Sequence, residues 1–500
     1  MRPLKTSVVQ AVHQNQMKPS KVVIHQTSPL YPSASPYHPS AVYPEYGFDT
    51  SELSAHNAAY DAVREVLHSL DLDNENFGTA AWNPLRSFVR PGDHVMVKPN
   101  MISPGHPLTG SWEHVITHPS VVRALVDYVL IALGETTGTV TIADGPQYDS
   151  DFELIVARTG LRALEAFYAA HGRHVRVLDL RPLWWPTLGG LPTKRLKLSG
   201  DPRGYVEVQL AETSEFSTYK GSGRFYGADY NMAETRRFHD GAHHHAYVLS
   251  RSALDADVFI NVSKLKTHKK TGVTLSVKNM VGLCGNRNCL PHHTCGTPSG
   301  GGDEMPDGLA AGLESRCVQF CKSALARRGG VAGPMWRGAF GLGRWVFGET
   351  SEVVRSGNWY GNDTAWRMAL DVYKAYLGFD GAGHKRRSPV RYLALVDGLI
   401  GGQGDGPLSP DPVPAGVIIA GADSVAVDTV AATLMGYDFR KLPIVSNGWS
   451  SRGGSATEGK PSDLTIASNV TAWQGTVENL ARSGGFGFIP HFGWQGHVEL

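Results

Sequence analysis

Charged and amide side chains follow several short apolar runs of the sequence, and their types suit the binding of an anion. One such run is followed by Lys98 and Asn100, and a second by Asp144. A third is followed by Lys264, Lys266 and His268. Ligands bind beyond the carboxyl ends of the strands in open α/β sheets, so these segments are candidates for one site. Lysine ammonium groups would hold a phosphate or carboxylate, and His268 is the candidate for proton transfer near neutral pH.

The segment from Lys264 to Lys278 is the densest of these signals. Lys264 and Lys266 alternate, so they point the same way if the chain is extended. Lys278 and Asn279 follow a predicted helix start near Thr274, whose backbone N–H groups would add donors for an anion. A solvated basic edge is the alternative for such a cluster.

Three aspartates, Asp144, Asp397 and Asp423, each lie at or just past a predicted strand end. Together they could hold Mg²⁺ beside a lysine-bound phosphate. The alternative is that each caps a helix or turn, and capping is the better explanation for Asp423, which precedes a predicted helix.

Glycines after Asp397, including Gly404 and Gly406, would let the backbone approach a ligand closely, although their spacing matches neither a Walker loop nor a dinucleotide fingerprint. We therefore expect His268, Asp144 and Lys266 to be catalytic. The expected substrate-binding residues are Lys98, Asn100, Lys264, Lys278, Asn279, Gly404 and Gly406, and the expected metal ligands include Asp397 and Asp423.

A second group of possible metal ligands lies between residues 284 and 304: Cys284, Cys289, His292, His293, Cys295, Asp303 and Glu304. Thiolates and imidazoles at such spacing suit zinc or an iron–sulfur cluster, with Cys317 and Cys321 as further candidates. The spacing matches neither a zinc ribbon nor a ferredoxin, so separately buried thiols are the alternative.

Apolar runs alternate with helical patterns along the body. The predicted strands are Lys21–His25, His94–Val97, Thr139–Ala143, Val175–Leu178, Val258–Val262, Arg391–Val396 and Val417–Ala420. The predicted helices are Ser54–Leu70, Pro119–Leu133 with Thr117 as its cap, Phe152–Thr159 and Ser424–Met435. This order predicts an α/β fold with a mostly parallel or mixed sheet and helices on both faces.

We expect an extended N-terminal arm over residues 1–50 and an α/β body over 51–500, with loop-rich insertions at 181–247 and 282–383. The Pro/Tyr-rich stretch of the arm, residues 29–46, favours an extended conformation that wraps a surface, such as that of a partner in a homo-oligomer.

The composition narrows the class of protein. Lys plus Arg (47) nearly equals Asp plus Glu (46), which gives no general electrostatic reason to bind nucleic acid. A content of 41% hydrophobic residues excludes a largely disordered chain. No apolar run is long enough to predict a membrane span. Five cysteines and a polar start predict a reducing, cytoplasmic location.

Several of these motifs together resemble the family called domain of unknown function 362. They are Val97-Lys98-Pro99-Asn100, Ala143-Asp144-Gly145, Ser263-Lys264-Leu265-Lys266-Thr267-His268, Lys278-Asn279, Asp397-Gly398 and Ala422-Asp423-Ser424, within roughly residues 90–440. The resemblance implies the α/β body and a single site, but no reaction. A ferredoxin-like segment found in some members is absent here, which argues against electron transfer. Similar chains commonly lack Cys284, Cys289 and Cys295, which shifts the expected metal ligands toward His292, His293, Asp303 and Glu304.

The leading hypothesis is an enzyme that acts on a small phosphorylated or carboxylated substrate with help from a divalent metal, Mg²⁺ or Zn²⁺. One alternative is a metal or iron–sulfur redox protein. The other is a structural or assembly protein that uses the N-terminal arm.

Overall fold

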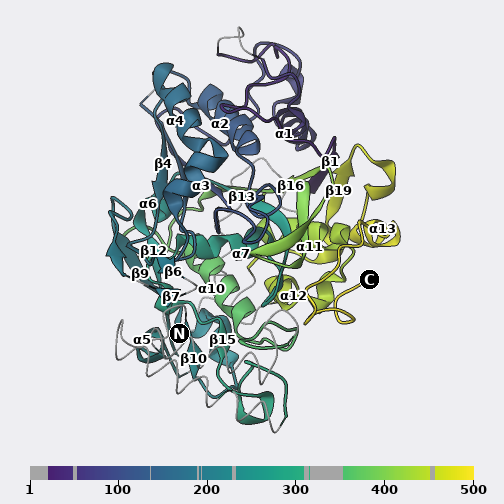
Figure 1. Ribbon diagram of the computed structural model, residues 1–500. Coiled ribbons are helices and arrows are strands. Elements are labelled where there is room, and N and C mark those ends of the chain that lie inside the picture. Colours follow the sequence, from purple (N-terminus) through teal and green to yellow (C-terminus); the bar gives the residue numbers. More distant parts are fainter. Residues whose placement is uncertain are drawn as a thin grey trace, which may run out of the picture.

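A computed structural model describes the chain at residues 21–48, 53–135, 137–188, 191–192, 194–227, 232–241, 243–308, 315, 353–450 and 456–500. Cys317 and Cys321 lie outside these residues. The described chain is organised around one large mixed sheet with helices on both faces (Figure 1), which confirms the predicted α/β class.

Five neighbouring strands of this sheet run parallel, so their carboxyl ends lie along one edge. In spatial order they are β16 (Arg391–Asp405), β13 (Val258–His268), β2 (His94–Pro99), β3 (Thr139–Asp144) and β4 (Val175–Asp179). Beyond β16 the sheet continues with β18 (Val417–Gly421), β1 (Lys21–Gln26) and β19 (Thr465–Ser468). The strand β18 is antiparallel to both β16 and β1.

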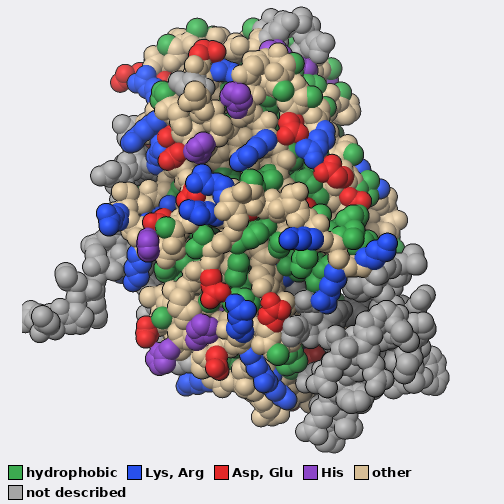
Figure 2. Space-filling view, turned by 90° about the vertical axis from the view of Figure 1, so that its left-hand side faces the viewer, with side chains coloured by type: hydrophobic (Ala, Val, Ile, Leu, Met, Phe, Trp, Pro, Cys, Tyr) green, Lys and Arg blue, Asp and Glu red, His purple; other side chains and the backbone are tan. Residues whose placement is uncertain are grey.

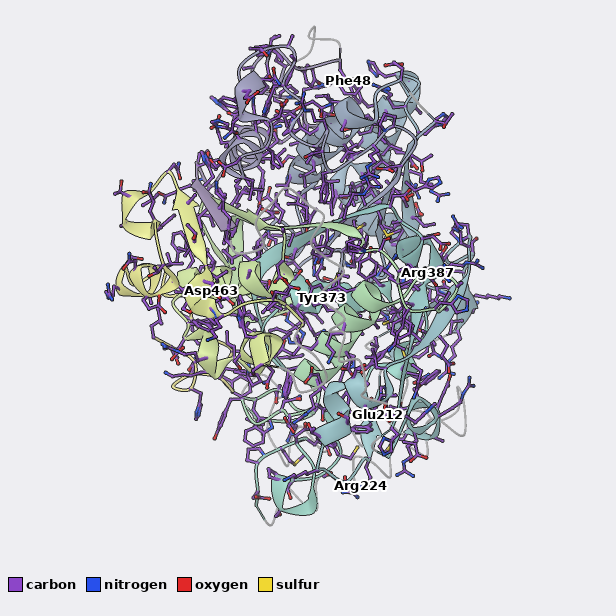
Figure 3. All side chains as sticks on the ribbon, turned by 180° about the vertical axis from the view of Figure 1, so that it is seen from behind. Phe48, Glu212, Arg224, Tyr373, Arg387 and Asp463 are labelled. Carbon is purple, nitrogen blue, oxygen red and sulfur yellow. The ribbon has the colours of Figure 1, made fainter. Side chains whose placement is uncertain are left out.

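The sheet separates two hydrophobic cores because successive strand residues face opposite ways. On β2, for example, Val95 and Val97 belong to one core and Met96 to the other. The first core also contains residues of α1 (Ala58–Ser69), α2 (Pro119–Leu133), α3 (Phe152–Thr159) and α4 (Leu161–Ala170). The second contains residues of α7 (Leu275–Asn279), α10 (Ala365–Gly378), α11 (Ser424–Met435), α12 (Pro443–Ser450) and α13 (Val477–Arg482). Figure 3 places Tyr373 of α10 in this interior.

All seven predicted strands are present; five extend one or two residues past the predicted end, and β13 and β16 extend six or more residues past it. Lys264, Lys266 and His268 do not follow β13; they belong to it, because Lys264 pairs with Asp397 of β16 and His268 with Gly272 of β14 (Gly272–Val273). Likewise Gly401, Gly402 and Gly404 lie in β16, whose distal half pairs with β17 (Ser409–Val413), and Gly406 follows the end of the strand. Backbone pairing with neighbouring strands extends these strands past the point where the apolar pattern stops.

The four predicted helices are also present, with one different cap. The imidazole of His118, not the Thr117 hydroxyl, accepts the hydrogen bond that caps α2. Thr117 instead joins two strands, since its Oγ1 donates to Val262 O (2.8 Å) and accepts from Asn100 N (2.9 Å).

The Pro/Tyr-rich stretch packs on the chain's own body. Tyr37 donates to Thr159 O (2.8 Å), Glu45 pairs with Arg64 (2.7 Å), and the Tyr31 ring stacks on His118 with centroids 3.9 Å apart. Whether the arm also contacts a partner subunit stays a prediction.

β9 (Tyr205–Gln209), within the 181–247 segment, pairs with β12 (His244–Ser250), which begins in that segment and ends beyond it, in a small separate sheet. Over the described residues, no helix has both the length and the apolar character needed to cross a bilayer.

Candidate anion-binding site at the carboxyl ends of the strands

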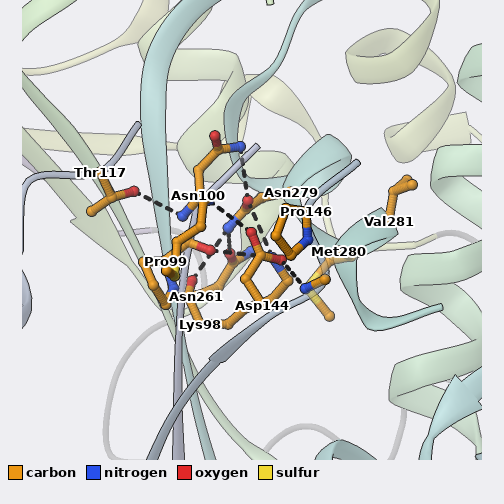
Figure 4. A network of polar contacts seen from close by, with 12 residues as sticks. Lys98, Pro99, Asn100, Thr117, Asp144, Pro146, Asn261, Asn279, Met280 and Val281 are labelled. Atoms are coloured by element: carbon orange, nitrogen blue, oxygen red, sulfur yellow. Dashed lines mark hydrogen bonds and ion pairs between the residues drawn. The ribbon is translucent and has the colours of Figure 1, made fainter. Parts of the chain in front are cut away.

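Lys98 at the end of β2 and Asp144 at the end of β3 form a buried ion pair (Figure 4), with Nζ and Oδ1 2.7 Å apart. Asp144 also accepts hydrogen bonds from Met101 N (2.7 Å) and Gly145 N (2.8 Å). Burial lowers the pKa of Lys98, and the Asp144 carboxylate opposes that shift. Both oxygens of Asp144 are therefore engaged by donors of the protein itself.

Asn279 connects this pair to the neighbouring strand (Figure 4). Its Oδ1 accepts from Lys98 Nζ (3.3 Å) and Asn100 Nδ2 (3.1 Å), and its Nδ2 donates to Asn261 Oδ1 (2.7 Å). The network fixes the orientation of the three amides and brings three of the predicted residues, Lys98, Asn100 and Asn279, together with Asp144.

Lys264 and Asp397 form a second buried ion pair, with Nζ and Oδ2 2.9 Å apart and no exposed side-chain surface. Asp397 also accepts from Tyr31 Oη (2.5 Å) and His118 N (2.8 Å), while Lys264 donates to Tyr31 Oη (2.9 Å). Tyr31 of the arm contacts both members of this ion pair. We therefore assign the Lys264–Asp397 pair a structural role and place neither a metal nor a substrate on it.

The ammonium group of Lys266 is surrounded by three oxygen acceptors. It donates to Asn100 Oδ1 (3.3 Å), Pro407 O (3.0 Å) and Val115 O. Burial, and next the positive charge of Lys264, lowers the pKa of Lys266. The three acceptors nevertheless require three N–H donors, which only the charged ammonium group supplies, so the geometry favours the charged form. Lys266 therefore joins three segments rather than offering a free donor.

Lys278 differs from the other three lysines, since its ammonium group has no hydrogen-bond or ion-pair partner among the described residues. It is 9% exposed and lines a cavity of about 50 Å³. Burial, and next the nearby Arg287 guanidinium, lowers the pKa of Lys278 to about 7. Lys278 thus presents an amine to the cavity in a mixture of charged and neutral forms near neutral pH.

Arg287 adds a second donor to the same cavity. Its Nη2 donates to Gly145 O and Pro146 O, and its Nη1 to Val281 O, but its buried Nε has no hydrogen-bond partner among the described residues. The three contacts fix the guanidinium in place beside the cavity and leave its Nε without an acceptor among the described residues.

His268 lines the cavity as a neutral imidazole, because burial, together with nearby Lys278, lowers its pKa well below the usual range. Its Nδ1 accepts from Lys270 N (3.0 Å), so Nε2 carries the hydrogen. In this tautomer His268 can donate a hydrogen bond to a ligand but cannot take a proton from it.

The other predicted residues lie apart from the cavity. Asp423 caps α11 by accepting from Ala426 N (2.9 Å), as the sequence favoured. Because β18 runs antiparallel to β16, its carboxyl end lies at the opposite edge of the sheet from that of β3. The three aspartates predicted to share Mg²⁺ therefore do not converge.

The glycines after Asp397 pack against the end of β13 and do not line the cavity. Gly404 O accepts from Thr267 Oγ1 (3.0 Å), and Gly406 O accepts from Lys269 N (2.9 Å). A Cβ at Gly406 would lie 2.1 Å from Thr267 O, so a larger residue is excluded there by β13 itself.

Comparison with known proteins gives the family. The model of a family described as Domain of unknown function (DUF362) matches residues 95–185 and 209–433, more than half of the chain. The chain belongs to this family. The cavity-lining residues of this DUF362 protein all fall within the matched ranges. The chain is also 22% identical, over 72% of its length and 68% of the relative's, to the "Thylakoid-associated protein sll1697" of Synechocystis.

The predicted metal ligands of this DUF362 protein separate into several places. Ligand atoms of His293, Cys295 and Glu304, all buried, lie within 4.8 Å of one another. Asp303 instead accepts from Thr294 N (2.6 Å) and Thr364 Oγ1 (2.6 Å), which holds two loops together.

The remaining ligands of that group do not join this cluster. Burial, and next Lys278, lowers the pKa of His292 well below its usual range, and its Nδ1 contacts Leu290 O (2.8 Å). Cys284 and Cys289 contact each other, and Cys289 Sγ donates to Asn286 O (2.8 Å). The three cysteines thus lie in two different environments.

A larger cavity of about 460 Å³ opens at the other edge of the sheet, near the amino ends of β2, β3 and β4. Figure 2 shows the left-hand side of Figure 1, where Lys and Arg side chains, with Asp, Glu and His among them, are interspersed with hydrophobic ones. Two of its arginines have partners, since Arg203 pairs with Asp255 (2.8 Å) and Arg173 with Glu135 (3.2 Å). Because the buried donors without partners lie at the opposite edge, we take the smaller cavity as the candidate site.

Sequence reasoning missed one residue of the site, Arg287, and one residue of the neighbouring Lys264–Asp397 ion pair, Tyr31. Arg287 lies between Cys284 and Cys289, in a stretch whose cysteines predict a metal site and give no role to a basic residue. Its position eight residues after Asn279 is the available signal. Tyr31 carries no sequence signal, since its contact with Asp397 joins residues more than 360 positions apart.

Proposed function

We propose that this DUF362 protein is an enzyme that acts on a small phosphorylated or carboxylated substrate, bound in the cavity beside Lys278 and Arg287. The observation that supports it is that these two donors, each 9% exposed, lack hydrogen-bond acceptors for Lys278 Nζ and Arg287 Nε among the described residues. An anion would supply those acceptors and compensate the charge, which favours anion binding over an empty pocket.

The size of the cavity suits one anionic group. A cavity needs about 10–15 Å³ to hold a single water, so a volume of about 50 Å³ accommodates a carboxylate or phosphoryl group and not a whole sugar. The residual exposure of Lys278 (9%) and His268 (7%) indicates that the cavity reaches solvent, so the rest of a larger substrate would lie outside.

Charge favours an anion over a metal cation in this cavity. The described lining contains the basic side chains of Lys266, Lys278 and Arg287 but a single carboxylate, Asp144. Asp144 already accepts from Lys98 and two backbone N–H groups. We therefore propose substrate binding here without metal help.

Calorimetric titration with inorganic phosphate and with acetate tests the proposal. We expect the protein to bind at least one of them, and Lys278→Gln and Arg287→Gln each to weaken that binding. Lys269→Gln, a partly exposed lysine of the same region, is the matched control and should bind as the unaltered protein does. Equal affinities in all variants, or no binding of either anion, would contradict the proposal.

Metal binding is a second candidate function, supported by the cluster of His293, Cys295 and Glu304. Imidazole, thiolate and carboxylate are the ligands that Zn²⁺ takes in proteins, and three protein ligands leave a fourth position open. The ammonium group of Lys270 lies 3.4 Å from His293 Nδ1 and opposes a cation there. Elemental analysis after dialysis against Zn²⁺ tests this function: one zinc per chain, lost in Cys295→Ser but kept in Cys284→Ser, would support it.

A further inference from the structure

Among Lys98, Lys264, Lys266 and Lys278, only the side-chain nitrogen of Lys278 has no hydrogen-bond or ion-pair partner in the described part of the chain. Lys98 contacts Asp144, Lys264 contacts Asp397, and Lys266 has three oxygen acceptors, whereas no partner of Lys278 occurs among the described residues. A nitrogen without acceptors is free to carry a lone pair toward the cavity.

The surroundings of Lys278 favour its neutral amine. The cationic side chains that act on it are Arg287 and Lys98; Cys284 acts in the opposite direction, but burial also holds the pKa of that thiol well above its usual range. His268 and His292 both lie near Lys278, and their lowered pKa values keep them neutral. Burial beside another cation is the arrangement that turns a lysine into a nucleophile, because the amine loses its proton near neutral pH.

We propose that Lys278 forms an imine with the carbonyl group of a small oxo acid held in this cavity. This inference rests on the proposed anion site and names its substrate class and the group that reacts. The carboxylate of the oxo acid would lie beside the Arg287 guanidinium, and the carbonyl oxygen would accept from His268 Nε2. Arg287 and His268 both line the cavity together with Lys278, so residues that can bind an acid group and a carbonyl group surround the same small space.

The reaction balances with water as its only by-product. The Lys278 nitrogen lone pair forms a bond to the carbonyl carbon, and the π electrons of the C=O bond move to oxygen. A proton passes from nitrogen to that oxygen, giving a carbinolamine, and the C–O bond then breaks as the nitrogen forms C=N. The oxygen leaves as water, with its second proton also taken from the former amine. Protonation of the imine by solvent gives an iminium group that withdraws electrons from the neighbouring carbon.

Reductive trapping tests this directly on the full-length protein. We expect pyruvate or glyoxylate with sodium cyanoborohydride to add the mass of the oxo acid less one oxygen atom, on the peptide that contains Lys278. Lys278→Arg keeps the positive charge but should lose the label, while Lys269→Arg should keep it. Because the label is mapped in the unaltered protein, the result does not depend on whether a variant folds.

The outcomes separate this inference from the proposed function. Binding of acetate or phosphate without any label on Lys278 from either oxo acid would overturn the imine and leave the anion site standing. Label confined to other lysines would also overturn it. Failure to bind any of these anions, with no label, would overturn both.

Discussion

Replacing Lys278 by Met should raise the free energy of unfolding at neutral pH, although it alters the candidate site. Methionine keeps an unbranched side chain of similar length and removes the charge. Burial lowers the pKa of Lys278 from 10.5 to about 7, and each pKa unit corresponds to about 1.4 kcal/mol. The buried ammonium therefore costs about 5 kcal/mol when fully protonated, and the substitution removes that cost.

The same shift predicts how the stability of the unaltered protein depends on pH. Below pH 7 the folded and unfolded chains both carry the Lys278 proton, so the full cost is present. Between pH 7 and 10 the folded chain loses this proton while the unfolded chain keeps it. The unfolded state then binds more protons, so stability rises with pH, and Lys278 should contribute about 3 kcal/mol to the rise.

Urea unfolding of the unaltered protein and of Lys278→Met, followed at several pH values from 6 to 10, measures this effect. The difference between the two curves isolates Lys278, since other titrating groups are common to both. Lys269→Met is the control and should track the unaltered protein. A difference that stays constant over this range, or a variant less stable at pH 7, would refute the argument that the Lys278 ammonium is desolvated and unpaired.

Three further substitutions test the structural roles assigned to the neighbouring residues. Lys264→Met leaves the buried Asp397 carboxylate without its cation and should lower the free energy of unfolding by about 3–5 kcal/mol. Most of this loss should be recovered when Asp397→Asn is added. If the losses of the two substitutions add in the double variant, the pairing is contradicted. Lys266→Met leaves three buried oxygen acceptors unpaired and should lower the free energy of unfolding by about 3 kcal/mol or more. An unchanged midpoint of denaturant unfolding would show that Lys266 does not hold these three segments together. Tyr31→Phe removes the hydroxyl between Lys264 and Asp397 and should cost about 1–3 kcal/mol, and an unaffected stability would mean that the arm does not cover the pair.

The strands of the sheet could be predicted because most are buried on both faces and therefore read as continuous apolar runs, such as Val258–Val262. Their ends could not. Lys264 and Lys266 interrupt the apolar pattern, yet their backbone continues to pair with β16, a strand more than 120 residues away. Side-chain patterns report burial, whereas strand length depends on partners that the local sequence does not contain.

The candidate site was predictable in its residue types but not in its division of roles. Lys266 and Lys278 look alike in sequence, and one was expected to be catalytic and the other to bind substrate. Their difference arises from acceptors supplied by Val115 and Pro407, each more than 140 residues from Lys266. The cap formed by Asp423 was predictable because its partner, Ala426 N, is three residues away.

The position of β1 in the sheet sets when the fold can be completed during synthesis. Gln26 of this first strand pairs with Val417 of β18, and the other edge of β1 pairs with β19. About 390 residues separate Gln26 from Val417, which at about 5–20 residues per second takes about 20–80 s to translate. During that interval the nascent β1 has neither neighbour, and its buried residues Val22, Val23 and Ile24 have no sheet to join. The apolar residues of β1 therefore acquire their sheet neighbours only when the chain is almost entirely made.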